Sequence, residues 1–473
     1  MFTFIASIII LILGYVFYGK FVEKVFVIKD SNETPAIAME DGVDYIPMSW
    51  PRIFLIQFLN IAGLGPIFGA IAGALWGPAA FLWIVLGCIF AGATHDYFSG
   101  MLSIRHKGTS VSEIVGIYLG DRAKQVMRVF SVVLLVLVGV VFIKGPAGLL
   151  SNITGIQATI WVGIIIAYYL LATVLPVDKL IGKIYPLFGA SLLIMAVGIG
   201  VGIIAKGYTI PEITLANLHP KGTSIFPFLF ITIACGAISG FHATQSPLMA
   251  RCVRKEREGR RVFYGSMIAE GIIALIWAAA AMAFFGGTDG LAATLGNGGP
   301  AVAVNEISRT LLGTVGGVLA LLGVVACPIT SGDTAFRSAR LVIADAINFK
   351  QDKTANRFMV AIPLFIVGIA LTQINFGIIW RYFSWSNQTL AMIVLWASAA
   401  YLAKNKKLHW ICTVPATFMT GVTTAYILQA EEGFKLAAGL SNSVGILTAV
   451  AFLGIFLVKS KKDHSVKQEK VTA

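Results

Sequence analysis

Charged side chains are scarce in this chain of 473 residues, because Asp, Glu, Lys and Arg make up only 12% of it. A soluble globular domain carries about twice that fraction. Acidic residues are the scarcer kind, 23 against 36 basic ones, which gives a net charge of +13. The basic residues stand in short loops between apolar runs, the pattern of membrane orientation, so we expect a lipid bilayer and no nucleic acid as partner. The sequence therefore predicts an all-α polytopic membrane protein.

Cysteine is also rare, and none of the five cysteines forms a CxxC pair. We expect free thiols, with no disulfide framework, no metal cluster and no cofactor. The motifs GxSxG and HExxH are absent as well. Ser239 and His242 stand three residues apart on an interrupted helix, which is weak geometry for a nucleophile and its base. We therefore expect a protein that is not an enzyme.

Thirteen apolar runs approach the length of about 20 residues that a membrane-spanning helix needs. They lie at residues 2–19, 53–74, 78–102, 126–143, 156–175, 184–205, 224–245, 262–285, 311–331, 358–377, 386–403, 408–428 and 443–458. With the N-terminus outside, alternating spans leave all but six of the basic residues in inside loops. The six are Lys144, Lys206, Lys221, Arg309, Arg381 and Lys435. The sequence thus predicts a multi-pass inner-membrane protein with a cytoplasmic C-terminus.

Two loops and the tail carry patterns of their own. Ser110 and Glu113 have the spacing of a capping box, which predicts an interfacial helix within 110–125. The outside loop 286–310 is rich in glycine and is either a flexible lid or a disordered connector. The tail from Lys459 onward is short and basic, and we expect it near anionic lipid.

The second apolar run contains the stretch Asn60-Ile-Ala-Gly-Leu-Gly-Pro-Ile-Phe-Gly69 near its centre. Gly63, Gly65 and Gly69 add no side-chain packing, and Pro66 removes a backbone donor. Such a helix is expected to break at its centre. In a membrane a break persists only where protein, ions or substrate satisfy the freed backbone groups. The alternative is a continuous helix whose glycines allow close packing.

The seventh run carries a second interruption, Ala234-Cys-Gly-Ala-Ile-Ser-Gly-Phe-His242, with Gly236, Ser239 and Gly240 at its centre. The two broken runs are five spans apart and cross in opposite directions. This is the pattern of an inverted five-plus-five repeat, which predicts a secondary transporter with its site at the repeat interface. The predicted units are an N-terminal helix with its loop (1–50), the first repeat (51–206), the inverted second repeat (207–404), two C-terminal helices (405–458) and a cytoplasmic tail (459–473).

The ninth run ends in Cys327-Pro-Ile-Thr-Ser-Gly-Asp-Thr334, where hydroxyls and the carboxylate of Asp333 follow a proline. Oxygen ligands of this kind suit a small hard cation. The stretch resembles the sodium site of transporters of the leucine-transporter type, in which Thr330 and Ser331 are the matching residues. In the alternative interpretation both hydroxyls bond within their own helix and Asp333 caps the next one.

Ionisable residues at membrane depth are candidates for proton transfer. Glu270 lies in the middle of the eighth run among apolar residues and is a candidate proton carrier, or else a structural hydrogen-bonding group. His242 directly follows the second break and could bind a carboxylate or relay a proton. His95 and Asp96 lie toward the inner end of the third run, where we expect a structural pair or an inner gate.

At these residues the chain resembles the carbon starvation protein A (CstA) family of membrane transporters. The stretches that carry the resemblance are Ile61–Pro66, Ala91–Asp96, Cys235–His242, Thr330–Arg340 and Trp385–Leu390. The family is associated with uptake of peptides, and some members with proton-coupled uptake of pyruvate, under nutrient limitation. Many members have a histidine pair where this chain has Gln57-Phe58. The resemblance implies a five-plus-five transporter fold.

These observations together predict a secondary active transporter that imports a small carboxylate-bearing nutrient, pyruvate or a short peptide. The substrate is expected between the two breaks, where the free amides of half-helices take its carboxylate. The coupling ion is either Na+ at Thr330 and Ser331 or a proton on Glu270 and His242. The alternative function is a membrane sensor that binds the same nutrient without net transport. The expected substrate-binding residues are Gly63, Gly65, Gly69, Gly236, Ser239, Gly240 and His242.

Overall fold

The computed structural model describes residues 1–29, 31–42, 45–173, 178–351 and 353–472, apart from the side chains of 178–186 and 462–472. Every regular element in these ranges is a helix. Nine helices of the described chain are long and apolar enough to cross a membrane, or ten if Trp50–Ile61 and Gly65–Trp76 form one bent span. Each of the thirteen predicted spans overlaps a helix or a broken helix, which confirms the predicted all-α polytopic architecture.

Most spans are single helices. They are α9 (Asp121–Thr154), α10 (Ala158–Ala172), α11 (Asp178–Ala205), α17 (Thr354–Thr372), α18 (Phe376–Lys404), α19 (Trp410–Gln429) and α20 (Ala438–Thr472). The short helices α3 (Pro35–Ala38) and α8 (Val111–Leu119) lie between spans.

Other spans contain one wider, π-helical turn, a feature that is frequent at functional sites. They are α1 (Phe2–Leu13) with η1 (Gly14–Tyr18) and α2 (Gly19–Phe26), α6 (Ala79–Leu86) with η4 (Gly87–Gly92) and α7 (Ala93–Arg105), η6 (Arg260–Tyr264) with α14 (Gly265–Phe284), and α15 (Thr288–Ala320) with η7 (Leu321–Ala326) and α16 (Cys327–Ala346).

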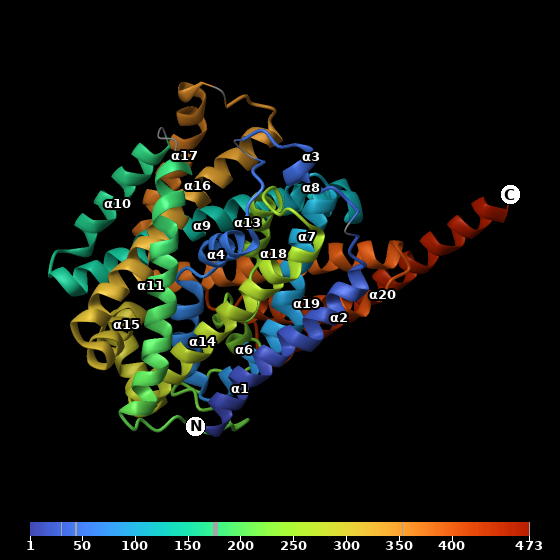
Figure 1. Ribbon diagram of the computed structural model, residues 1–473. Helices are drawn as coiled ribbons and strands as arrows, with labels where there is room; N and C mark the ends of the chain where they lie inside the picture. Colours follow the sequence, from blue (N-terminus) through green and yellow to red (C-terminus); the bar gives the residue numbers. More distant parts are fainter. Residues whose placement is uncertain (30, 43–44, 174–177, 352, 473) are drawn as a thin grey trace.

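Two spans are interrupted by non-helical backbone. The first consists of α4 (Trp50–Ile61), η2 (Gly65–Gly69), α5 (Ala70–Gly73) and η3 (Ala74–Trp76), and its halves are bent by 55°. The second consists of α12 (Phe228–Thr232) and α13 (Gly240–Ala250). Both lie in the middle of the bundle, with α7, α14 and α18 around them, while α10, α11 and α15 form one flank (Figure 1). The core of the protein therefore surrounds the two breaks.

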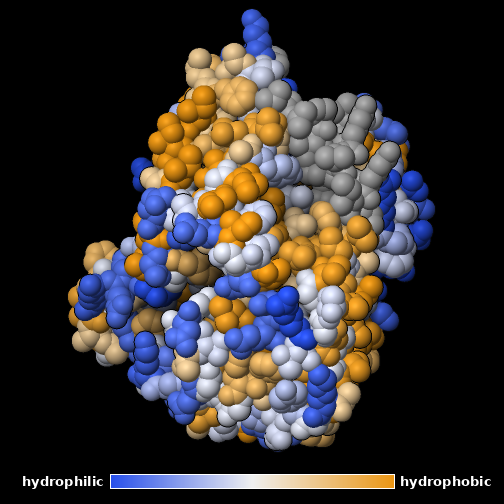
Figure 2. All heavy atoms as spheres, turned by 90° about the vertical axis from the view of Figure 1, so that its left-hand side faces the viewer, coloured by the Kyte–Doolittle hydropathy of each residue, from blue (hydrophilic) through white to orange (hydrophobic). Residues whose placement is uncertain are grey.

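Large apolar areas are exposed on the flank formed by α10, α11 and α15 (Figure 2). The exposed side chains there include Ile164, Leu171, Val197 and Val315, each more than half exposed. In water such a surface would be unfavourable, whereas in a bilayer it is the normal outer surface of a spanning helix. These helices therefore face lipid.

Three local expectations differ from the structure. Ser110 precedes α8 as predicted, but its side chain makes no cap, and the Glu113 carboxylate bonds to Lys124 (2.6 Å) and Arg128 (3.0 Å). The loop 286–310 is not a disordered connector, since α15 starts at Thr288 and departs from helical backbone within this range only at Gly299 (φ 70°), and the lid stays a prediction. The ninth span does not end at residue 331. Pro328 comes just after the π-helical turn η7, and the helix continues through it to Ala346.

Candidate functional site

The first break is formed by Ala62, Gly63 and Leu64, between the end of α4 and the start of η2. The amide of Gly63 donates to the carbonyl of Ile61 (2.9 Å), a bond that closes a tight turn in place of the helical pattern. All five residues of η2, Gly65–Gly69, are buried. The expected interruption of this helix is therefore present, and protein surrounds it.

The second break spans residues 233–239, between α12 and α13. The carbonyl groups of Phe230, in α12, and of Ile233, at the start of the break, accept hydrogen bonds from the side-chain amide of Gln388 on α18. The indole of Trp83 on α6 also donates to Ile233 (3.2 Å). Buried backbone groups freed by the break are thus satisfied by side chains of neighbouring helices, as an apolar environment requires.

Asn387 on α18 satisfies the other side of this break, at the N-terminus of α13. Its Oδ1 accepts from the backbone amide of Phe241 (2.7 Å) and from the hydroxyl of Ser239 (3.2 Å). Its Nδ2 donates to Ser239 Oγ (3.0 Å) and to Cys235 Sγ (3.5 Å). Ser239 is therefore bonded to Asn387, and the hydroxyl is not placed on His242. An amide oxygen occupies the helix N-terminus at which we expected a substrate carboxylate.

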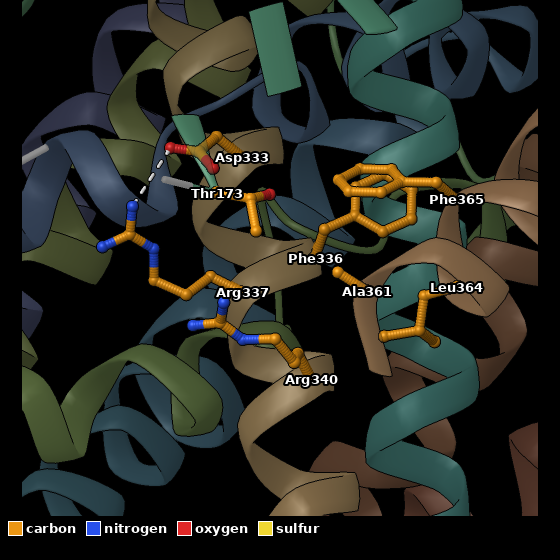
Figure 3. Close-up of a pocket in the computed structure, with 8 residues that line it drawn as sticks. All are labelled: Thr173, Asp333, Phe336, Arg337, Arg340, Ala361, Leu364 and Phe365. Atoms are coloured by element: carbon orange, nitrogen blue, oxygen red, sulfur yellow. Dashed lines mark ion pairs between the residues drawn. The ribbon is translucent and has the colours of Figure 1, made fainter. Parts of the chain in front are cut away.

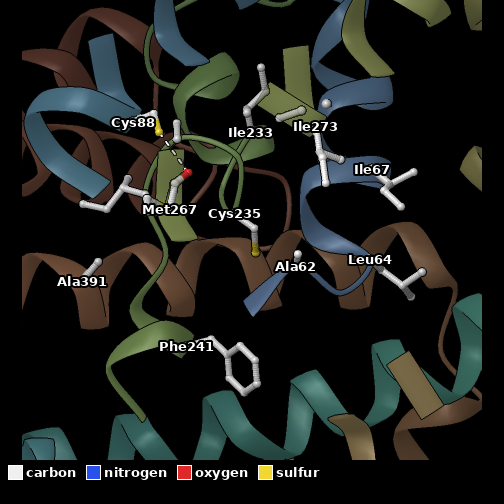
Figure 4. Close-up of a cluster of buried hydrophobic side chains, with 14 of the residues drawn as sticks. Ala62, Leu64, Ile67, Cys88, Ile233, Cys235, Phe241, Met267, Ile273 and Ala391 are labelled. Atoms are coloured by element: carbon white, nitrogen blue, oxygen red, sulfur yellow. Dashed lines mark hydrogen bonds between the residues drawn. The ribbon is translucent and has the colours of Figure 1, made fainter. Parts of the chain in front are cut away.

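The two breaks pack directly against one another. A Cβ atom on Gly65 would lie 2.2 Å from Cys235 Sγ, and one on Gly69 would lie 3.1 Å from the Thr232 carbonyl oxygen. Figure 4 shows Cys235 beside Ala62 and Leu64 of the first break. The close-packing role that we considered for these glycines is therefore real, and it acts between the two interrupted spans.

The remaining predicted glycines are also tightly packed. A Cβ on Gly63 would lie 2.6 Å from the Phe142 ring, one on Gly236 2.4 Å from Ala274, and one on Gly240 2.3 Å from the backbone oxygen of Asn387. Each contact joins the break to a different helix, α9, α14 or α18. In this conformation the two breaks are closed on all of these sides.

A chain of four ionisable residues lies next to the breaks. The carboxylate of Asp96 on α7 bonds to His95 Nδ1 through Oδ1 and to His242 Nδ1 through Oδ2, both at 2.8 Å. His242 Nε2 lies 3.3 Å from Glu270 Oε2 on α14. All four side chains are fully buried. The predicted pair His95 and Asp96 is therefore present, and it is joined to His242 and Glu270, a connection that the sequence analysis missed.

Three of the buried groups near the second break offer ligand atoms of the kind that binds transition metals. Cys235 Sγ, His242 and a Glu270 carboxylate oxygen lie within 4.8 Å of one another. The bond from His242 Nδ1 to Asp96 orients the imidazole, as carboxylates behind the ligands do at metal centres. The same arrangement suits a proton shared between the imidazole and the carboxylate of Glu270. These residues could hold either kind of cation.

The predicted cation site on α16 lies near the first break, because Cys327 Sγ donates to the carbonyl of Leu59 (3.7 Å) on α4. The hydroxyl of Thr330 bonds within its own helix, to Cys327 O (2.8 Å) and Ala326 O (3.3 Å). Ser331 is buried. The position of Thr330 and Ser331 near the first break thus fits a cation site. The hydrogen bonds of Thr330, however, match the alternative interpretation, in which the hydroxyls bond within their own helix.

Asp333 lies inside α16 and does not cap the following helix. Its Oδ2 lies 3.7 Å from Arg337 Nη2, an i,i+4 pair. Figure 3 shows this pair at the wall of a small pocket, together with Arg340 and Phe365. Asp333 therefore balances an arginine on its own helix.

Sequence reasoning assigned no role to Gln57 or Asn387. Gln57 lies one turn before the first break and is fully buried, and neither of its amide atoms has a hydrogen-bond partner among the described residues. Buried groups of this kind are exceptional in folded proteins. The signal in the sequence that could have indicated a role for Gln57 was its position, where many members of the CstA family have histidine.

An all-helical bundle with two broken spans, closed around buried ionisable groups, is the architecture of a secondary membrane transporter. Solved structures of mutants of the Eremococcus coleocola manganese transporter share it. One mutant matches with a TM-score of 0.56 over 92% of this chain and 98% of that chain, at 14% identity. A second mutant matches with a TM-score of 0.53 over 87% of this chain and 94% of that chain, at 13% identity. At this identity the likeness is one of fold, and it confirms the predicted fold class.

The family is shown by the sequence. The family described as Carbon starvation protein CstA matches residues 1–147 and 146–296, and the chain belongs to this family. An uncharacterized membrane protein of Haemophilus influenzae is 48% identical over 60% of this chain and 91% of its own. The protein named Peptide transporter CstA of Campylobacter jejuni is 26% identical over 93% of this chain and 82% of its own. That of Escherichia coli is 28% identical over 58% of this chain and 48% of its own. The resemblance inferred from the motifs is confirmed.

Proposed function

We propose that this transporter imports a small carboxylate-bearing nutrient, pyruvate or a short peptide, by ion-coupled alternating access in the inner membrane during nutrient limitation. The observation that supports it best is the buried chain from His95 through Asp96 and His242 to Glu270. It joins α7 of the predicted first repeat to α13 and α14 of the second. Ionisable residues inside a membrane are costly, and in transporters they form proton relays.

In this proposal Glu270 and His242 carry the coupling proton, while Asp96 and His95 fix the imidazole and gate the inner side. Thr330, Ser331 and Asp333 are the residues proposed for Na+ instead. The proton route has the stronger support, because Thr330 is bonded within α16 and Asp333 is paired with Arg337.

The proposed substrate site lies between the two breaks. Amides of Gly63, Gly65 and Gly69 on one side, and of Gly236, Ser239 and Gly240 on the other, would bind the carboxylate together with His242. Since these glycines are closed against neighbouring residues here, binding requires the breaks to separate. Alternating access between two repeats supplies such a movement.

The test is uptake of labelled pyruvate into proteoliposomes that contain the purified protein, with a proton gradient and a sodium gradient imposed separately. We expect accumulation above the outside concentration with the proton gradient alone. Accumulation that needs sodium would move the coupling to Thr330 and Ser331. If pyruvate is not accumulated, labelled dipeptides are tested in the same vesicles. Saturable binding of either nutrient without accumulation would contradict transport and favour the sensor.

A further inference from the structure

A groove of about 730 Å³ lies between α8, α9, α18 and α20. Its rim is apolar and open, with Ile117, Val126 and Ile455 each about half exposed. Its floor contains Trp396, which is 5% exposed and lies 5.4 Å from the Phe456 ring, centroid to centroid. Volumes of about 300–1,000 Å³ are typical of sites that bind small molecules.

One end of the groove is basic. Lys404, at the C-terminus of α18, and Lys459, on α20, both line it. The ammonium of Lys404 lies 5.9 Å from the centre of the Tyr118 ring, which holds it over α8. Among the described side chains, no carboxylate lies within 4.0 Å of either lysine. The two lysines begin the stretches 404–407 and 459–470, which the charge distribution places on the cytoplasmic side.

The groove also has the length of one lipid leaflet. Thr389 and Lys404 are its outermost residues on α18, and fifteen residues of helix extend about 22 Å. One leaflet with its headgroup region, half of a bilayer of about 40–45 Å, is about 20–22 Å thick. A ligand with a long apolar chain and an anionic head would therefore place the chain along Trp396 and the head between the two lysines.

We propose that this groove binds an anionic phospholipid of the phosphatidylglycerol type, with its phosphate between Lys404 and Lys459 and one acyl chain over Trp396. Basic pockets between spanning helices on the cytoplasmic side are a known mode of anionic-lipid recognition. The site involves none of the residues assigned to transport.

The test is fluorescence quenching of the full-length protein in phosphatidylcholine nanodiscs that contain increasing fractions of brominated phosphatidylglycerol or brominated phosphatidylcholine. The signal of Trp396 is the part of the emission that Trp396→Phe removes. We expect this part to be quenched at lower fractions of phosphatidylglycerol than of phosphatidylcholine. Lys404→Gln together with Lys459→Gln should weaken the preference about 25-fold, since each lysine near an anionic surface contributes about a factor of five.

Lys221→Gln together with Lys435→Gln is the matched control, because it removes two exposed lysines from loops that are predicted to lie outside. We expect the control to keep the preference. Ile455→Phe narrows the groove without changing charge or adding a tryptophan, and should reduce quenching by both lipids. Equal quenching by the two lipids in the wild type, or equal loss in the groove and control variants, would overturn the proposal. So would native mass spectra showing a dimer, without bound lipid, that Ile455→Phe dissociates.

Discussion

At the scale of single residues, Asp96 determines how the centre of the protein is arranged. Its two carboxylate oxygens are each bonded to a histidine at 2.8 Å, one on its own helix and one beside the second break. His242 is thereby held with Nε2 toward Glu270. Removing one partner from a buried charged group leaves the other uncompensated, at a cost of about 3–5 kcal/mol. The four residues are therefore expected to act as one unit.

Glu270→Gln tests whether this unit couples transport to protons. The amide keeps the shape of the carboxyl group but cannot take up a proton. We expect uptake driven by a proton gradient to fall to the level of empty vesicles, while exchange of labelled for unlabelled substrate continues. Glu306→Gln, at an exposed position of α15, is the control and should leave both activities unchanged. Concentrative uptake by the Glu270→Gln variant would assign the coupling ion elsewhere.

The contact between Gly65 and Cys235 tests the packing of the two breaks. Gly65→Ala places a methyl group 2.2 Å from Cys235 Sγ and should lower the free energy of unfolding by about 1–3 kcal/mol. Adding Cys235→Gly removes both atoms that this methyl group meets, so the melting temperature should recover. The comparison is Gly92→Ala, whose methyl group would meet the backbone oxygen of Ala237 at 2.2 Å and should not be rescued by Cys235→Gly. Equal behaviour of the two alanine variants would argue against the direct contact.

At the scale of helices, α18 holds the second break closed through two adjacent amides. Asn387 bonds to the start of α13, and Gln388 bonds to the carbonyls at the end of α12. We expect Asn387→Ala to lower stability by about 1–3 kcal/mol, because the amide of Phe241 loses its buried acceptor. The reaction of Cys235 with a thiol reagent should become faster as the break opens. Asn405→Ala, exposed at the end of the same helix, is the control. An unchanged rate at Cys235 would mean that the break opens independently of Asn387.

The sequence was sufficient to predict the existence of these elements but not their partners. Glycines and Pro66 predicted the first break because they weaken a helix locally. The bond between Asp96 and His242 could not be predicted, since it depends on how α7 packs against α13 across 146 residues of chain. The sequence indicated Asn387 only as part of a family motif. Its role could not be predicted, because it accepts a hydrogen bond from the first turn of α13, which lies far away in sequence. The ninth span ended later than its hydropathy indicated, since α16 continues as a polar helix.

The anchoring of α1 depends on a single acidic residue in the loop before α12. Glu212 accepts hydrogen bonds from the amides of Phe2 and Thr3, both at 2.8 Å. The Met1 amino group and these bonds lower the pKa of Glu212 from 4.5 to about 2. Because the pKa is lower in the folded protein, the stabilisation is complete above pH 4.5 and is lost as the pH falls toward 2.

Hydrogen exchange can follow this anchor. At about pH 5 we expect slow exchange of the Phe2 and Thr3 amides, and at about pH 2 faster exchange relative to their intrinsic rate. Glu212→Gln should show the faster exchange already at the higher pH, whereas Glu33→Gln, in an exposed loop, should not. Protection that is the same at both values of pH would show that Glu212 does not hold the helix.

At the scale of the whole molecule, the arrangement of the spans depends on their number and on the distribution of basic residues. The loops at Asn348 and Ala437 are separated by α17, α18 and α19, so that they must lie on opposite sides of the membrane if each helix crosses once. The five native cysteines are all buried, which provides a low background for labelling. Cysteines introduced by Asn348→Cys and Ala437→Cys can therefore be located with a thiol reagent that does not cross the membrane.

We expect Ala437→Cys to react in intact cells and Asn348→Cys to react only after the membrane is permeabilised, because the charge distribution predicts that the basic loops lie inside. The wild type, treated in the same way, sets the background. The two possible failures have different meanings. Reaction of both sites from the same side would contradict the number of crossings, and with it the inverted relation of the two repeats. An exchanged pattern would leave the repeats intact and reverse only the orientation, so that Lys404 and Lys459 would lie in the outer leaflet.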